Sequence, residues 1–181
     1  MGPRENQDAV SNQHQVFRIA GVTRYMYAGD WMHGNDIGAL AQMHFGALND
    51  LLGVAGLAGS TFKTRVRRMW AELVKAYDAT GVREGRLQIL TPKMLEHATK
   101  QLKCKASVAS KLIIPMLHLC ERFDDGSDRS GHRVEAYRAL REMDALVRNS
   151  GVFMPDNDSK ALKDAVDTFL IHFKWLHVED P

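Results

Sequence analysis

Asp30 and His33, three residues apart, are the side chains whose types and spacing most readily suggest chemistry. Such a pair offers a carboxylate, the kind of oxygen ligand that Mg²⁺ prefers, and a titratable imidazole. β-forming residues between Val16 and Tyr27 precede the pair, and an amphipathic helical pattern begins directly after it. The alternative interpretation is structural, because Asp is common as a turn or cap residue between a strand and a helix.

The other histidines and the cysteines predict no second site. His44 falls on the apolar side of a helical pattern, and we interpret it as a core histidine with hydrogen-bond partners. Cys104 and Cys120 are interpreted as free, buried thiols rather than as a disulfide, which suits a reducing compartment. Four further histidines have no partner at metal-ligand spacing: His97, His118, His172 and His177.

Positive charge is concentrated in the middle of the chain. Residues 60–122 contain 13 Lys and Arg against 5 acids, whereas the rest contains 11 bases and 17 acids. Five bases share one predicted helix, on the face opposite its apolar stripe: Lys63, Arg65, Arg67, Arg68 and Lys75. Four lysines would extend this surface: Lys100, Lys103, Lys105 and Lys111. The pattern predicts contact with the DNA backbone and not with bases, because no base-reading motif is visible. The alternative is a solvated face, or one paired with acids such as Glu135, Glu142 and Asp144.

The elements that must position these residues are mostly helical. Apolar residues recurring every three or four positions predict about five or six helices. We expect a disordered polar tail over 1–15 and a single helical domain over 16–181. Within that domain, 16–33 would be an extended segment ending at Asp30, and 35–178 the helical region. The predicted fold class is therefore mainly α, a helix bundle with a small N-terminal strand element.

Caps and breakers predict where the helices begin and end. The first helix should run from Asn35 or Asp36 to about residue 59, and the second from Ser60 to Gly81. Thr91-Pro92 should open a short helix to about residue 99. A helix over 107–123 should kink or restart at Pro115. We expect a loop over 124–131, a helix ending near residue 151, a turn over 155–158 and a last helix.

The stretch from Asp30 to Gly38, with the sequence DWMHGNDIG, resembles the Asp-x-Met-His-x-x-x-Leu-Gly stretch of DDE-type transposases of the CACTA group. The likeness is closest over residues 21–48. In that family the aspartate is the second acid of a ribonuclease H-like metal site, and a helical insertion follows it. The resemblance implies that Asp30 binds one of two Mg²⁺ ions about 3.5–4 Å apart, which together promote DNA cleavage and strand transfer. It implies that His33 supports this site or touches the substrate.

The resemblance also implies an incomplete site. Only 29 residues precede Asp30, which leaves little room for the strands that carry the first acid, and the third acid is expected after the helical insertion. We therefore expect a transposase-derived fragment that is not catalytic and holds no cofactor by itself. It would contact the DNA backbone and self-associate through exposed apolar surface. The alternative is an unrelated helical protein–protein interaction domain with no enzymatic activity.

The hydropathy of the sequence allows a prediction of the cellular location of the protein. No apolar run approaches the ~20 residues that a membrane-spanning helix needs. The polar residues 1–15 lack the apolar region of a secretory signal. We expect an intracellular protein, nuclear or cytoplasmic, with no membrane partner.

Overall fold

The structure is a computed structural model that describes residues 38–54, 57, 59–96, 100–150 and 154–178. Most of these residues lie in helices. The prediction of a mainly α fold with about five or six helices is confirmed within these ranges. The predicted strand element over 16–33 lies outside them. In chain order the helices are α2 (Leu40–Leu52), α3 (Phe62–Ala79), α4 (Pro92–Leu95), α5 (Ala106–Arg122), α6 (Asp128–Asn149) and α7 (Asp156–Val178).

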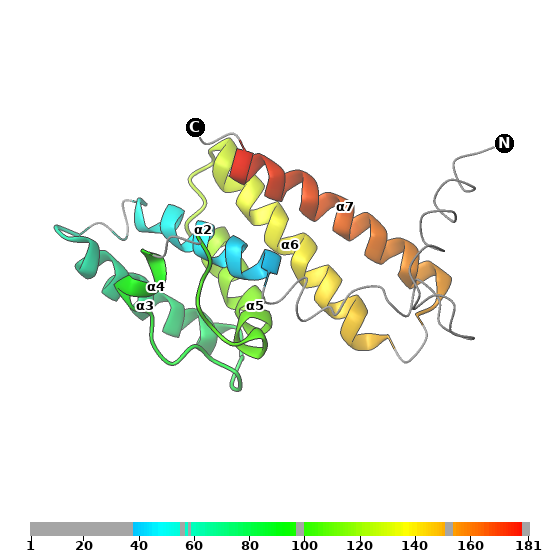
Figure 1. The fold of residues 1–181 in the computed structure, drawn as a ribbon, viewed down its shortest axis with the longest axis horizontal. Helices are drawn as coiled ribbons and strands as arrows, with labels where there is room; N and C mark the ends of the chain where they lie inside the picture. The colour runs from blue at the N-terminus through cyan, green and yellow to red at the C-terminus, as the bar shows by residue number, and fades with distance from the viewer. Residues whose placement is uncertain (1–37, 55–56, 58, 97–99, 151–153, 179–181) are drawn as a thin grey trace, which may run out of the picture.

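The helices are arranged as a long hairpin beside a group of shorter helices (Figure 1). α6 and α7 run antiparallel and share the most extensive helix–helix interface. α5 packs against α6 and also against α2 and α3, while the short α4 contacts α2 and α3. α5 is therefore the element that joins the α3 side of the molecule to the hairpin.

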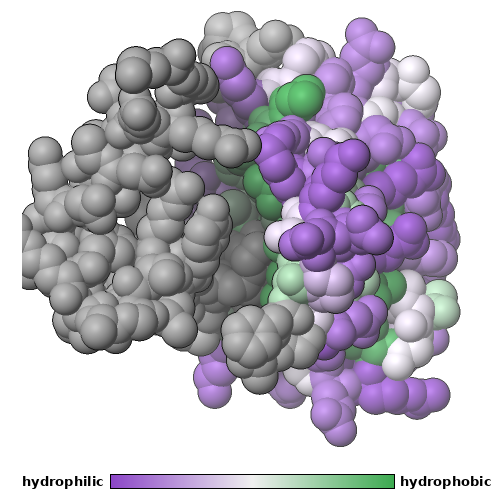
Figure 2. Space-filling view, turned by 90° about the vertical axis from the view of Figure 1, so that its right-hand side faces the viewer, coloured by the Kyte–Doolittle hydropathy of each residue, from purple (hydrophilic) through white to green (hydrophobic). Residues whose placement is uncertain are grey.

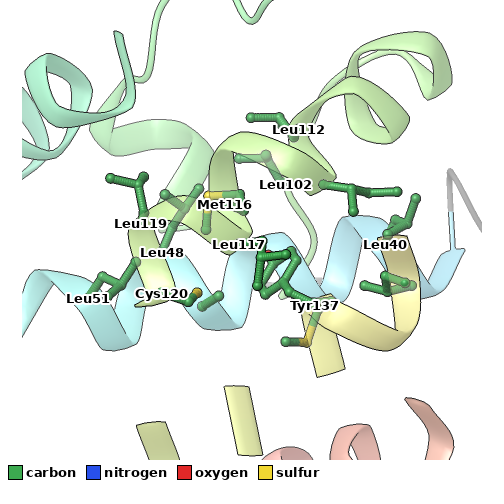
Figure 3. Packing of buried hydrophobic residues seen from close by; sticks show 14 of the residues in the cluster. Leu40, Leu48, Leu51, Leu102, Leu112, Met116, Leu117, Leu119, Cys120 and Tyr137 are labelled. Atoms are coloured by element: carbon green, nitrogen blue, oxygen red, sulfur yellow. The ribbon is translucent and has the colours of Figure 1, made fainter. Parts of the chain in front are cut away.

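The hydrophobic core lies where α2, α5 and α6 meet (Figure 3). Leu48 and Leu51 of α2 are fully buried, as are Met116 of α5 and Tyr137 of α6. Leu102, from the segment before α5, joins them and is anchored because its N–H donates to the carbonyl of Ala41 at 2.9 Å. The apolar repeats read from the sequence are thus the residues that face this core.

Two helix starts follow the predicted chemistry closely. α3 begins one residue after the expected position, with Thr61 instead of Ser60 as the N-cap, and the Thr61 hydroxyl accepts from the Thr64 N–H at 3.1 Å. α4 begins as predicted, with Thr91 in extended conformation and Pro92 in the first turn. Thr61 caps α3 through its side chain, whereas the Thr91 side chain makes no capping hydrogen bond and α4 is favoured by Pro92 in its first turn.

The predicted end of the first helix is wrong. α2 ends at Leu52 and not near residue 59, because Gly53 occupies the C-cap position. The Gly53 N–H donates to the Asp50 carbonyl at 3.0 Å, and the Val54 N–H donates to the Leu51 carbonyl at 3.1 Å. These bonds satisfy carbonyls that would otherwise be left without partners at the end of the helix.

The loop predicted over 124–131 and the turn predicted over 155–158 are both too long. α6 already begins at Asp128, because the Ser127 hydroxyl accepts from the Ser130 N–H at 3.2 Å and so caps the helix. α7 begins at Asp156, where the Pro155 carbonyl accepts from the Ser159 N–H at 2.9 Å. In each case acidic residues lie in the first turn, where the helix dipole favours negative charge.

α5 does not restart at Pro115. It runs unbroken from Ala106 to Arg122, and its N-cap is Lys105 instead of the expected Ser107. Pro115 is buried, and its ring nitrogen has no hydrogen to donate to the preceding turn. Packing of the neighbouring residues Leu112, Ile113 and Met116 in the core compensates for this missing bond.

The two cysteines are free thiols, as predicted. Cys120 is buried and Cys104 partly buried. Burial raises the pKa of Cys104 to about 11 and that of Cys120 to about 12, so both remain protonated at neutral pH.

On the outside, hydrophilic residues cover most of the described surface seen in Figure 2, with smaller hydrophobic areas between them.

Candidate nucleic-acid interface

Of the predicted site residues, the structure describes the basic group but not the pair Asp30 and His33. Asp30 and His33 lie outside the described residues, so their proposed roles in catalysis and in binding a metal stay predictions. The basic residues of the predicted second helix all lie on α3, within the described residues. The geometry of α3 therefore bears directly on the predicted nucleic-acid contact.

α3 is an amphipathic helix with a clear division of faces. Val66, Met69 and Leu73 are buried, together with Ala76 and Tyr77 one turn later. On other sides of the helix, four of the five predicted bases are exposed to solvent: Lys63, Arg67, Arg68 and Lys75. The helical period that buries the apolar stripe is what presents these bases outward.

Arg65 differs from the other bases of α3. It is only partly exposed, its guanidinium lies 5.9 Å from the centre of the Phe62 ring, and its Nε is buried. That Nε has no hydrogen-bond partner among the described residues. The Arg65 side chain also lies close to Gly59, since a Cβ at residue 59 would be 3.3 Å from Arg65 Cγ. Arg65 therefore lies at the partly buried edge of the basic face of α3 and not on its exposed side.

The acids of α3 are already engaged by bases. Glu72 accepts from Lys75 Nζ at 2.7 Å and from Arg122 of α5 at 2.6 Å. The hydrogen bond from Lys75, followed by the nearby Arg122 charge, lowers the pKa of Glu72, so it is a carboxylate at neutral pH. Asp78 accepts from Arg86 at 2.9 Å. Neither acid therefore remains to neutralise the first two turns of α3.

Two of the three acids proposed as partners for this surface, Glu135 and Asp144, pair elsewhere. Glu135 binds Arg138 at 2.7 Å and Asp144 binds Arg148 at 2.7 Å, and all four residues lie on α6. Within the described residues, no carboxylate forms an ion pair with Lys63 or Arg67. The four lysines expected to extend the surface, Lys100, Lys103, Lys105 and Lys111, are all exposed.

Arg122 is a member of this surface that the sequence did not reveal. It is 50 residues from Glu72 in sequence, and the packing of α5 against α3 brings the two together. Arg122 belongs to the basic stretch 60–122, but its position in the sequence does not predict that it lies beside α3. The cluster of Lys75, Arg122 and Glu72 carries one net positive charge.

A pair of histidines was also missed. His132 of α6 and His172 of α7 are joined Nδ1 to Nδ1 at 2.7 Å, and His132 stacks on Trp175 with ring centres 4.1 Å apart. Burial, and then the neighbouring His132, lowers the pKa of His172. Residue spacing along one helix does not predict this contact, because it forms between two helices of a hairpin.

The prediction for His44 is confirmed. Its ring is fully buried, with Nε2 2.9 Å from the Ala109 carbonyl and Nδ1 2.8 Å from the Tyr137 hydroxyl. A carbonyl can only accept, so Nε2 carries the proton and Nδ1 accepts from the Tyr137 O–H. His44 is a satisfied core residue and takes no part in a surface site.

Comparison of the chain with protein-family models, with curated proteins and with solved structures gave no match. Among the described residues, no group of three or more His, Cys, Asp and Glu side chains is placed to hold a metal ion. No helix in that part of the chain combines the length and the apolar character that crossing a membrane requires.

Proposed function

We propose that this protein binds the nucleic-acid backbone through α3, without base specificity and without catalysis. The observation that carries the proposal is the exposed Lys63 and Arg67, which have no paired carboxylate within the described residues, while Glu72 and Asp78 are engaged by other bases. Lysine and arginine side chains in such a position contribute to the free energy of binding, because they release the counterions condensed on phosphates.

The evolutionary part of the proposal rests on sequence alone. The resemblance of the stretch around Asp30 and His33 to CACTA-group transposases supports descent from a DNA-cleaving and strand-joining protein. The helical region after that stretch would then correspond to the insertion of the ancestral enzyme. A surface that follows the DNA backbone would be retained from such an ancestor, while Mg²⁺-dependent chemistry needs partner acids besides Asp30.

Salt dependence of binding tests the proposal. Each phosphate neutralised should contribute about −0.9 to the slope of log affinity against log salt, so three or four contacts give a slope of about −3 to −4. Fluorescence anisotropy with two duplexes of unrelated sequence, between about 50 and 200 mM salt, measures this slope. The two duplexes should bind equally, because the contacts are to phosphates.

A matched pair of variants locates the surface. The double variant Lys63→Glu with Arg67→Glu should lose most of the binding, since both side chains are exposed and the buried stripe of α3 is unchanged. The control is Lys160→Glu with Lys174→Glu, which changes net charge equally on exposed positions of α7. Equal losses in both variants, or a parent protein that fails to bind duplex at low salt, would contradict the proposal.

The second candidate is a helical protein–protein interaction domain. The observation that favours it is apolar exposure on α7, where Leu170 is 52% exposed and Ile171 is 65% exposed. An interaction domain of this kind would bind duplex weakly and show no difference between the α3 variant and the α7 control. The same anisotropy experiment therefore separates the two functions.

A further inference from the structure

His132 and His172, which we call the histidine pair, join α6 to α7 at the end of the hairpin opposite to the connection between the two helices. His132 lies in the second turn of α6, and His172 lies in the second-last turn of α7 (Figure 1). Their Nδ1 atoms are 2.7 Å apart and their ring centres 4.9 Å apart. Both side chains are partly exposed, so solvent protons can reach this contact without unfolding of the protein.

The bond between the two rings depends on their protonation. A hydrogen bond between two imidazole nitrogens needs one nitrogen that carries hydrogen and one that offers a lone pair. As long as one ring is neutral, it can supply the lone pair. When both rings are imidazolium, both Nδ1 atoms carry hydrogen, and two N–H groups face each other where the bond was. The second proton therefore replaces an attraction with a repulsion between two positive rings.

The surroundings of the histidine pair oppose this second proton. Burial, followed by the nearby His132, lowers the pKa of His172 below its ordinary value of 6.5, although Glu135 acts in the opposite direction. A detached α7 therefore binds a proton more readily than the packed helix does. The contact stabilises the hairpin fully above pH 6.5, and this stabilisation decreases as the pH falls below that value.

Charged groups around the histidine pair are mostly acids. Asp124 and Asp128 line a cavity of about 430 Å³ together with the pair, and Glu135 lies beside it on α6. Glu135 already binds an arginine of α6 at 2.7 Å, while Asp124 and Asp128 are exposed and screened by water. On α7, Lys174 is exposed and lies two residues from His172, on a different face of the helix. The carboxylates therefore weaken the repulsion between two charged rings without removing it.

Trp175 extends the contact into a stack of rings. Its ring lies on that of His132, with centres 4.1 Å apart and planes 13° apart. Trp175 follows His172 by three residues on α7, so both side chains lie on the side of α7 that faces α6. Among the described helices, α7 packs extensively only against α6. The C-terminal turns of α7 therefore depend mainly on contacts of this kind.

We propose that the histidine pair is a pH-sensitive switch, which holds the C-terminal turns of α7 on α6 while one ring is neutral and releases them when both rings are protonated. Release moves Trp175 from its stack into water and uncovers apolar side chains of α7 such as Leu176. The contacts among α2, α5 and α6 do not involve α7 and stay in place. The switch does not depend on the nucleic-acid proposal.

Trp175 fluorescence reports the state of the switch. Trp31→Phe with Trp70→Phe leaves Trp175 as the only tryptophan of the chain. Between about pH 7.5 and 5, its emission maximum should move to longer wavelength as the ring enters water, while circular dichroism shows that most of the helix remains. A fall in intensity without a wavelength shift would mean protonation without release. That result, an unchanged spectrum, or a shift that accompanies loss of most of the helix would each overturn the proposal.

His172→Asn, made in the same single-tryptophan chain, separates the switch from general effects of acid. A side-chain amide can donate to a neutral His132 and accept from a charged one, so the contact should survive acid and the wavelength shift should disappear. His118→Asn is the matched control and should keep the shift, because His118 is a partly exposed histidine of α5. The same shift in all three proteins would show that the histidine pair is not its cause.

Hydrogen exchange of the unaltered chain decides the question if these variants do not fold. After correction for intrinsic exchange rates, the opening equilibrium constant of amides in 170–178 should rise at least about fivefold between about pH 7.5 and 5.5, since one titrating group contributes up to about tenfold per pH unit. Amides in 160–166, near the other end of α7, are the control and should change much less. Equal increases in the two segments would show that acid loosens the whole helix and not the histidine contact.

Discussion

His44 shows how far a single residue could be interpreted from its sequence position. Its place on an apolar helical stripe predicted a buried and hydrogen-bonded ring, and this is confirmed. The identity of its partners was not predictable, because Tyr137 is 93 residues away and Ala109 offers only its backbone carbonyl. The ring also stacks on Tyr137, with centres 5.7 Å apart. A periodic pattern reports burial, while the partner depends on how the helices pack.

The buried state of His44 predicts loss of stability in acid. Burial lowers its pKa from 6.5 to about 4, so the unfolded chain takes up a proton that the folded protein does not. The stabilisation is fully present above pH 6.5 and is lost as the pH falls toward 4. From this group alone we expect a loss of about 3 kcal/mol. Urea unfolding at a series of pH values measures it.

A double variant, His44→Leu with Tyr137→Phe, isolates this contribution. It removes the titrating ring and its hydroxyl partner together, so no polar group of the pair stays unsatisfied. Other groups also make the parent less stable in acid, among them Asp125, whose pKa its hydrogen bonds to Ser127 lower to about 2. The variant should therefore keep part of the pH dependence and lose the portion between pH 6.5 and 4. An unchanged profile would refute the assignment to His44.

At the scale of elements, helices were predicted better than their ends. Periodicity located the helices α2 to α7, because the alternation of buried and exposed residues is a local property of the sequence. The start of α6 was missed because Asp124, Gly126 and Gly131 together suggested a loop. Ser127 followed by Asp128 carried the opposing signal, an N-cap residue and then an acid in the first turn.

The Ser127 cap can be measured directly. Ser127→Ala removes the acceptor for the Ser130 N–H and should lower the free energy of unfolding by about 1 kcal/mol. Ser127→Asn is the control, because Asn caps helices about as well as Ser and should cost much less. Chemical denaturation of the three proteins gives the comparison. Equal losses for Ala and Asn would show that another contact of Ser127, such as its bond to Asp125, matters more.

For the whole molecule, the sequence predicted the fold class and the basic face but not the contacts between helices. Lys63, Arg67, Arg68 and Lys75 are exposed, in line with a face read from one helix. The contacts of Asp50 with Arg129 and Arg133 were not anticipated, since they join α2 to α6 across 79 residues or more. Local periodicity carries no information on which helix faces meet, and that pairing creates such contacts.

The attachment of α7 has a consequence for how the molecule opens. Among the described helices, α7 packs extensively only against α6, and Leu170 and Ile171 are exposed on it. A helix held by one neighbour can detach while the others stay packed, so its amide hydrogens should exchange by local opening. Hydrogen exchange with mass spectrometry should find lower opening free energies in α7 than in α5, which three helices cover. Equal protection in both would mean that the hairpin and the core open as one cooperative unit.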